Sequence, residues 1–424
     1  MTTSCRAASA APPPRIHIDV TAWWDRRNAP VGISRVVVEL AKAVHEISIL
    51  NRAWRYDRQW QRLVEVPWAE FERVVGPPLD QTSGAARLRA AAGRTPFARE
   101  ISETVLRWGR RLLVWLRLHP AFLVLEPSDR FVFGGWIGDA ARLRVYRQML
   151  DPCPHNVSLY CHDVIPAILP ELVESQVAAV FDGYLDVFVS SRTQIFCPSA
   201  ATKRDLCKLL PDTRPPRRIS VVSPGSDIED AGSGHEAEEC ATSIDRDYIL
   251  YVSTIEIRKN HAVLLDAYGT LLERGRADLP LLVFVGKRGW SIDPLLQEID
   301  RGHGRSSSVR IMDDVSDRQM GALYRGARFT VFPSLYEGWG IPVGESLRFG
   351  RFCLSSDRGG SREAGAGLVE LLDPTNSRLW ADRIEHYLDH PDQLLAREAD
   401  IRSRYRPRSW TEFRSDIMAE LADA

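Results

Sequence analysis

The sequence lacks several patterns that would assign it to common classes of protein. No apolar run approaches the roughly 20 residues that a membrane-spanning helix needs, so we expect no such helix. The seven cysteines include no Cys-x-x-Cys pair, which argues against a disulfide framework and against a structural zinc site. The formal net charge of -1 gives no support to nucleic-acid binding. We therefore expect a cytoplasmic protein, either free or peripheral at the inner face of the membrane.

Two nucleotide-binding patterns are also missing. No Gly-x-Gly-x-x-Gly follows the first strand of either half, which argues against a dehydrogenase. The segment 285–288 lacks the upstream glycine and the following Ser or Thr of a P-loop. Lysine is scarce, and none of its positions is an obvious carrier of pyridoxal phosphate, as a phosphorylase would need: Lys42, Lys203, Lys208, Lys259 and Lys287.

What the sequence does contain is a repeated alternation of strands and helices. A chain of 424 residues is longer than one hydrophobic core usually grows, so two domains are expected. Short β-branched runs alternate with helical patterns, which is typical of parallel sheets built from βαβ units. The fold class we predict is α/β, with two Rossmann-like domains facing across a cleft. The predicted strands are 15–20, 130–135, 158–163, 193–198 and 218–225, then 247–252, 280–286, 308–312, 328–333 and 351–356.

Changes in composition suggest where the domains begin and end. We expect a disordered leader at 1–14, a first domain over 15–229 and a polar linker over 230–246. Within the first domain, an Arg- and Trp-rich insertion at about 46–128 is expected to hold helices and loops. A second domain would cover 247–400, and the helix expected at 401–424 would cross back to the first domain.

The loops that follow parallel strands hold the candidate site residues, because ligands bind beyond the C-terminal ends of such strands. After the strand at 328–333, Glu337 lies in a loop and Glu345 is expected in the first turn of the next helix, near Pro342. Gly338 and Gly340 would let a ligand approach the backbone. Two carboxylates there could hold sugar hydroxyls, but each alone is equally well explained without a ligand: Glu337 as a solvated loop residue and Glu345 as a residue that favours the helix dipole.

Two cations follow the first strand of the second half. Arg258 and Lys259 are placed to make charge-assisted hydrogen bonds to a diphosphate. An isolated Arg-Lys pair is more often an ordinary surface feature. In the first half, Gly32 precedes a helix whose apolar positions follow the helical period, and His162 ends the strand at 158–163. Both of these residues have equally simple structural explanations.

Taken together and in chain order, these motifs resemble the glycogen-synthase-like retaining glycosyltransferases of family four, which adopt the two-domain GT-B fold. The resemblance is strongest over about 247–375 and is closest to bacterial mannosyltransferases of surface-polysaccharide assembly. It implies that Glu337 and His162 face the donor sugar and that Arg258, Lys259 and Gly32 hold the diphosphate. Glu345 would bind the ribose. The backbone contacts to the donor would come from Gly338, Trp339, Gly340 and Ile341.

The resemblance also implies no cofactor and no metal. The one Asp-x-Asp, at 245–247, precedes a strand and is poorly placed to hold an ion. The donor would be a nucleotide diphosphate sugar, with GDP-mannose first and a deoxyhexose or glucose donor as alternatives. The acceptor would be a saccharide or a polyprenyl-diphosphate-linked saccharide, as in O-antigen, capsule or exopolysaccharide synthesis.

Two questions stay open at this stage. The chain is either an enzyme or a non-catalytic component of an assembly complex that binds nucleotide sugars. The insertion supplies Trp54, Trp60 and Trp68, and a segment at 104–118 that is either a helix lying on the membrane surface or a helix packed on the first sheet.

Overall fold

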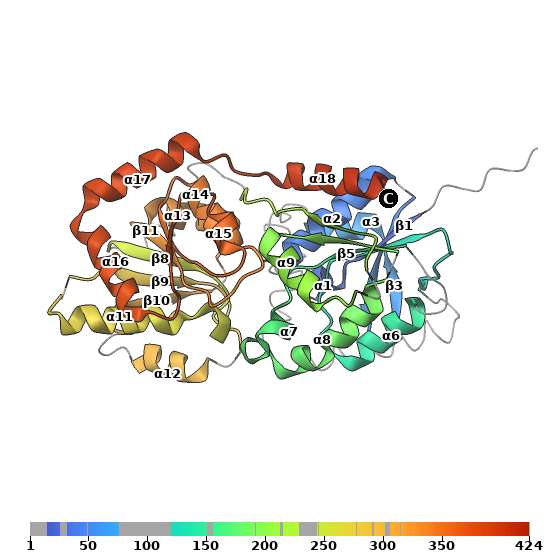
Figure 1. Ribbon diagram of the computed structural model, residues 1–424, viewed down its shortest axis with the longest axis horizontal. Coiled ribbons are helices and arrows are strands. Elements are labelled where there is room, and N and C mark those ends of the chain that lie inside the picture. Colours follow the sequence, from blue (N-terminus) through green and yellow to red (C-terminus); the bar gives the residue numbers. More distant parts are fainter. Residues whose placement is uncertain are drawn as a thin grey trace, which may run out of the picture.

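A computed structural model describes thirteen parts of the chain, and two α/β lobes contain them (Figure 1). The expected leader, the segment 104–118 and most of the expected linker lie outside the described residues. The described parts are 15–25, 32–48, 50–75, 120–150, 156–190, 192–212, 215–228, 244, 246–276, 278–290, 292–301, 306–313 and 315–423.

The first lobe is built on a seven-stranded sheet. Its strand order is β3-β2-β1-β4-β5-β6-β7, and every pairing is parallel except that of β2 with β3. The strands are β1 (Ile16–Asp19), β2 (Arg52–Asp57), β3 (Arg62–Val66), β4 (Arg130–Phe133), β5 (Asn156–Tyr160), β6 (Thr193–Cys197) and β7 (Arg218–Val221).

The hairpin of β2 and β3 corrects the expectation that the insertion holds only helices and loops. The arginine and tryptophan residues of β2 obscure the alternation of polar and apolar positions that is typical of a strand. The side chain of Trp54 nevertheless points into the core. Trp54 is buried, and its indole donates to His17 Nδ1 over 3.0 Å, while His17 Nε2 lies 3.1 Å from Asp129. Trp54 therefore completes the first core and does not contribute to an acceptor surface.

The second lobe is built on a six-stranded, wholly parallel sheet in the order β10-β9-β8-β11-β12-β13. The five strands predicted for this half are all present, and β13 is an additional one. The strands are β8 (Tyr248–Val252), β9 (Leu281–Val285), β10 (Val309–Met312), β11 (Phe329–Phe332), β12 (Cys353–Ser356) and β13 (Glu370–Leu372).

Helices cover both sheets, as the βαβ pattern predicts. In the first half they are α1 (Thr21–Trp24), α2 (Ile33–Ile47), α3 (Trp68–Val75), α6 (Ala140–Leu150), α7 (Ile165–Ile168), η1 (Pro170–Leu172), α8 (Ser175–Phe188) and α9 (Ala200–Leu209). In the second half they are η2 (Ile257–Lys259), α11 (His261–Glu273), α12 (Asp293–Arg301), α13 (Asp317–Gly326), α14 (Ile341–Arg348), α15 (Ser361–Ala364), α16 (Ser377–Asp389), α17 (Pro391–Arg404) and α18 (Trp410–Ala422).

The last helix, α18, lies on the first lobe, although α17 before it belongs to the second (Figure 1). Its apolar side chains Trp410, Phe413, Ile417 and Leu421 join the same buried cluster as the inner face of α2. The Arg414 guanidinium also pairs with Glu39 of α2. The chain thus crosses between the lobes a second time near its end, which ties the two lobes together.

No helix in the described parts of the chain combines the length and the apolar character needed to cross a membrane.

Candidate functional site

The junction between the lobes brings together loops from the C-terminal ends of neighbouring strands. Strand β8 pairs with β11, so the loop with Arg258 and the loop with Glu337 emerge side by side. Backbone bonds join the two loops: Leu335 N donates to Arg258 O over 2.9 Å. The Arg258 guanidinium donates to Tyr336 O over 3.0 Å. Sheet register, rather than sequence proximity, therefore positions this pair of loops.

Glu337 is held between two cations. Its Oε2 lies 2.8 Å from Arg258 NH1, and its Oε1 accepts a short hydrogen bond from Lys259 Nζ. All three side chains are largely buried. Burial raises the pKa of Glu337, but the charges of Arg258 and Lys259 outweigh it and hold the pKa at about 2. Glu337 is therefore ionised at neutral pH.

Burial lowers the pKa of Lys259, and the neighbouring Arg258 lowers it further, while Glu337 opposes both effects. Arg258 also pairs with Glu256 over 2.7 Å, so two carboxylates, Glu256 and Glu337, balance the charges of the two cations. A diphosphate could make charge-assisted hydrogen bonds to both cations, in competition with these carboxylates.

His162 reaches the junction from the first lobe, where it follows β5. Its Nε2 lies 2.6 Å from the carbonyl oxygen of Gly134, and because a carbonyl only accepts, Nε2 carries the proton. Burial lowers the pKa of His162 to about 4, so the ring is neutral at pH 7. The imidazole proton is used within the first lobe, which leaves Nδ1 as an acceptor towards a ligand.

Gly338 lies directly against the first lobe. A Cβ on Gly338 would lie 1.9 Å from the carbonyl oxygen of His162, a distance that no side chain could occupy. The Gly338 carbonyl in turn accepts hydrogen bonds from Ser199 Oγ over 2.7 Å and from Thr202 Oγ1 over 3.2 Å. Glycine is required here for close approach between lobes.

The first turn of α9 anchors the second lobe further. Glu363 of α15 accepts from the backbone amides of Ala200 over 2.8 Å and Ala201 over 2.9 Å. Amides at a helix start have no partner within the helix, and a carboxylate there also favours the helix dipole. Tyr336 makes a short hydrogen bond to Asp205 on the same helix. The sequence did not predict these contacts, because Glu363 and Asp205 resemble ordinary polar residues on the surface of a helix.

Glu345 lies in the second turn of α14, not in the first turn as expected, because the helix already begins at Ile341, directly after Gly340 with its φ of 104°. Its Oε2 accepts from Tyr324 OH over 2.9 Å, and its Oε1 lies 3.5 Å from Arg35 of the first lobe. Burial raises the pKa of Glu345, and Arg35 opposes that effect. Gly32, three residues before Arg35, is the N-cap of α2 with a φ of 54°.

Trp339 and Ile341, two of the residues expected to contact the donor through their backbone, have side chains that pack against the hydrophobic cores. Trp339 packs against the core of the second lobe, and Ile341 packs against the cluster that α2 and α18 form in the first. The structure therefore brings Glu337, Arg258 and Lys259 into direct contact. It places His162 and Gly338 against one another and Gly32 on the helix that reaches Glu345. Among the described residues, no cluster of His, Cys, Asp or Glu has the arrangement of a metal site.

Asp163 is a further carboxyl group at the junction. Burial raises its pKa to about 6, against the opposing charge of Arg258. Its Oδ1 accepts from Ile165 N over 2.9 Å at the start of α7. His162 and Glu337 have pKa values well below this range, whereas Asp163 titrates near pH 6.

We expect this titration to change the affinity for an anionic sugar nucleotide. As the pH falls from 8 to 5, Asp163 takes up a proton and loses its negative charge, so the positive potential of Arg258 and Lys259 rises. Binding of a nucleotide diphosphate should tighten by roughly three- to tenfold, the scale of one unit charge at about 10 Å in a partly screened site. Calorimetric titration across this pH range would measure the change. In Asp163→Asn, which keeps the Oδ1 acceptor, the profile should be flat; an unchanged slope would contradict the assignment.

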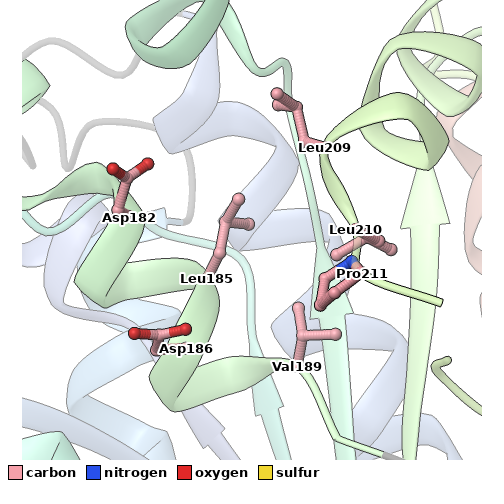
Figure 2. A pocket seen from close by; sticks show the side chains of 7 residues that line it. All are labelled: Asp182, Leu185, Asp186, Val189, Leu209, Leu210 and Pro211. Atoms are coloured by element: carbon pink, nitrogen blue, oxygen red, sulfur yellow. The ribbon is translucent and has the colours of Figure 1, made fainter. Parts of the chain in front are cut away.

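A separate hollow of about 200 Å³ lies elsewhere in the first lobe, at the C-terminal ends of α8 and α9 (Figure 2). Its lining includes Asp182 and Asp186 with apolar neighbours such as Leu185 and Leu210. Helix α9 begins against Gly338 and runs ten residues, so this end lies about 15 Å from the junction. The hollow contains none of the predicted site residues.

Comparison with known proteins identifies the second half of the chain. A match to the protein family described as Glycosyl transferases group 1 covers residues 238–404, which include Arg258, Lys259, Glu337 and Glu345. Residues 238–404 are a glycosyltransferase group 1 domain. This confirms the resemblance inferred from the motifs.

Curated relatives match the chain over part of their lengths. The O-antigen chain mannosyltransferase B of Escherichia coli is 42% identical over 103 residues, which are 24% of this chain and 26% of that protein. The D-inositol 3-phosphate glycosyltransferase of Corynebacterium urealyticum is 31% identical over 193 residues, 42% of this chain and 45% of that protein. The chain thus spans less than half the length of each.

Solved structures show the fold of both lobes. Anabaena HepE in complex with UDP-glucose superposes with a TM-score of 0.63 at 14% identity, over 97% of this chain and 100% of that one. The sucrose-phosphate synthase of Thermosynechococcus elongatus has a TM-score of 0.63 at 14% identity, over 97% and 98% of the chains. The predicted GT-B fold is confirmed, with the glycosyltransferase group 1 domain as its second lobe.

Proposed function

We propose that the chain is a retaining glycosyltransferase that moves a hexose, mannose in the first instance, from a nucleotide diphosphate sugar to a saccharide acceptor. The acceptor is either a free saccharide or one linked to polyprenyl diphosphate, in the assembly of a bacterial surface polysaccharide. The observation that carries this proposal is the buried group of Glu337, Arg258 and Lys259 at the junction. It combines two cations for a leaving diphosphate with a carboxylate for sugar hydroxyls.

The chemistry follows from the charges. In sugar transfer, the bond between the anomeric carbon and the diphosphate oxygen breaks, and the diphosphate keeps the electron pair. Positive side chains fixed at that oxygen stabilise the charge as it develops, and a low-dielectric site strengthens the effect. Arg258 and Lys259 would do this without a metal ion. The sugar passes through an oxocarbenium-like transition state, the acceptor oxygen forms the new bond to the anomeric carbon, and its proton goes to the released diphosphate.

The other groups at the junction fit the same donor. Glu345 would accept from the ribose hydroxyls, and the neutral His162 ring would accept from a hydroxyl of the sugar through Nδ1. Gly340 would leave the backbone of the loop open to the sugar, whereas Gly338 is taken up by its contacts with the first lobe. Gly32 and the start of α2 would approach the diphosphate from the first lobe.

The donor is proposed from similarity. The E. coli relative is named as a mannosyltransferase of the O-antigen chain, which supports mannose and polysaccharide assembly. The Corynebacterium relative is named for transfer to inositol phosphate, and HepE was crystallised with UDP-glucose, so glucose and other hexoses are the alternatives.

Thermal shift against GDP-, UDP- and dTDP-sugars tests the proposal, because a ligand that binds the native state raises the melting temperature. At a hundredfold excess over Kd, binding adds about 2.7 kcal/mol, and we expect a rise of several degrees for one base and little for the others. A flat response to the whole panel would refute donor binding. Binding without transfer to any acceptor and without slow donor hydrolysis would instead favour a non-catalytic nucleotide-sugar-binding component.

A further inference from the structure

Arg35 of the first lobe contacts two carboxylates of the second. Its NH1 lies 3.5 Å from Glu345 Oε1, and its NH2 donates to Asp317 Oδ2 over 2.5 Å. The Arg35 side chain is only 20% exposed, so the junction encloses most of it. The two carboxylates differ: Glu345 is buried, whereas the Asp317 side chain is 56% exposed.

The position of Arg35 on its own helix is electrostatically unfavourable. It is the third residue of α2, where the helix dipole places partial positive charge, and no acidic residue lies in that turn. A cation there is disfavoured by the helix and depends on outside anions. The carboxylates of Glu345 and Asp317 supply them across the junction.

Binding of the proposed donor would change the contacts that Arg35 makes with Glu345 and Asp317. The ribose hydroxyls are proposed to bind Glu345, and one methylene group joins that ribose to the first phosphate. The phosphates must therefore lie close to whatever contacts Glu345. Arg35 contacts it now, at a distance too long for a strong ion pair. The flexible stem and forked guanidinium of arginine suit it to phosphate oxygens.

We propose that Arg35 is a third cation of the diphosphate site, supplied by the first lobe, and that donor binding exchanges its contact with Glu345 for one with the phosphates. This inference rests on the proposed function and deepens it. Arg258 and Lys259 would hold the diphosphate from one side and Arg35 from the other. Binding of the nucleotide would then link the two lobes through its phosphates, next to the contacts of Gly338.

Calorimetric titration of the full chain with nucleotides that differ only in phosphates tests this role. GDP, GMP and guanosine form one series, and UDP, UMP and uridine form a second. In Arg35→Ala, affinity for the diphosphate of the preferred base should fall at least about tenfold, the scale of a lost charged hydrogen bond. Affinity for the nucleoside should change less than about twofold. Arg35→Lys should recover part of the loss, because it restores the charge without the fork.

Asp317→Asn provides the matched control. This change removes the competing carboxylate and leaves Arg35 in place, so affinity for the diphosphate should stay the same or rise. A tenfold loss in Asp317→Asn would overturn the proposal. So would equal losses of nucleoside and diphosphate binding in Arg35→Ala, because Arg35 would then act only by orienting Glu345. If the wild type bound no nucleotide of either series, the proposed function itself would fail.

Discussion

Replacement of Lys259 by alanine should reduce sugar transfer at least about a hundredfold, the scale on which removing one preorganised electrostatic group lowers turnover. Lys259 contacts Glu337 in a buried site, and its charge is one of two that would stabilise the leaving diphosphate. Arg258 would remain to neutralise Glu337, so the protein should stay folded. Initial rates with saturating donor, together with the melting temperature, measure the two effects separately.

Lys287 offers the matched control for this variant. It follows β9, the strand next to β8, and its side chain is exposed. Lys287→Ala changes the net charge equally and should leave transfer within about twofold, as expected for a surface site away from special contacts. Near-normal transfer by Lys259→Ala would refute its assignment to the diphosphate.

A test of Glu337 needs a substitution that does not also destabilise the fold. Replacement by alanine is also expected to abolish most transfer, but it would leave two buried cations close together, and breaking a buried pair in this way costs about 3 to 5 kcal/mol of stability. Glu337→Gln keeps the size and one oxygen acceptor. A large loss of transfer in Glu337→Gln at an unchanged melting temperature would separate the role in the site from the role in folding.

Gly338→Ala should lower turnover about a hundredfold, the cost that a misplacement of about 1 Å can impose on a reaction. A Cβ there would meet the backbone carbonyl of His162 at 1.9 Å, and backbone cannot rotate aside as a side chain can. The loop with Glu337 must therefore shift, and the hydrogen bonds from Ser199 and Thr202 to Gly338 would be lost or distorted. Steady-state kinetics would show the loss in kcat.

Gly138→Ala is the comparison for this prediction. It lies in the first lobe, and the nearest atom to an added Cβ is Val177 Cγ2 at 3.6 Å, an ordinary contact distance. This variant should keep wild-type turnover. Wild-type kcat in Gly338→Ala would show that the two lobes need not meet closely for the reaction.

Several parts of the molecule could be read from local patterns. Each predicted strand has a counterpart in one of the two sheets, because β-branched runs and helical periods are properties of short segments. The hairpin of β2 and β3 could not be predicted from local patterns, since its arginines and tryptophan obscure the alternation of buried and exposed positions. Helix α14 begins earlier than predicted, so Glu345 lies in its second turn; Gly340 and Pro342 both suit a helix start, and the sequence alone does not choose the exact residue.

The sequence by itself determined the fold class and placed Glu337, Arg258 and Lys259 in loops that follow parallel strands. Loops after neighbouring parallel strands emerge at one edge of a sheet, so motifs at strand ends predict a common site. Only the tertiary structure decided which side chains meet between the lobes. Arg35 approaches Glu345, Glu363 caps α9 and Gly338 lies against His162 because of the relative orientation of two separately built sheets. That orientation depends on many weak contacts between residues far apart in the chain, so it cannot be predicted from local periodicity or from short motifs.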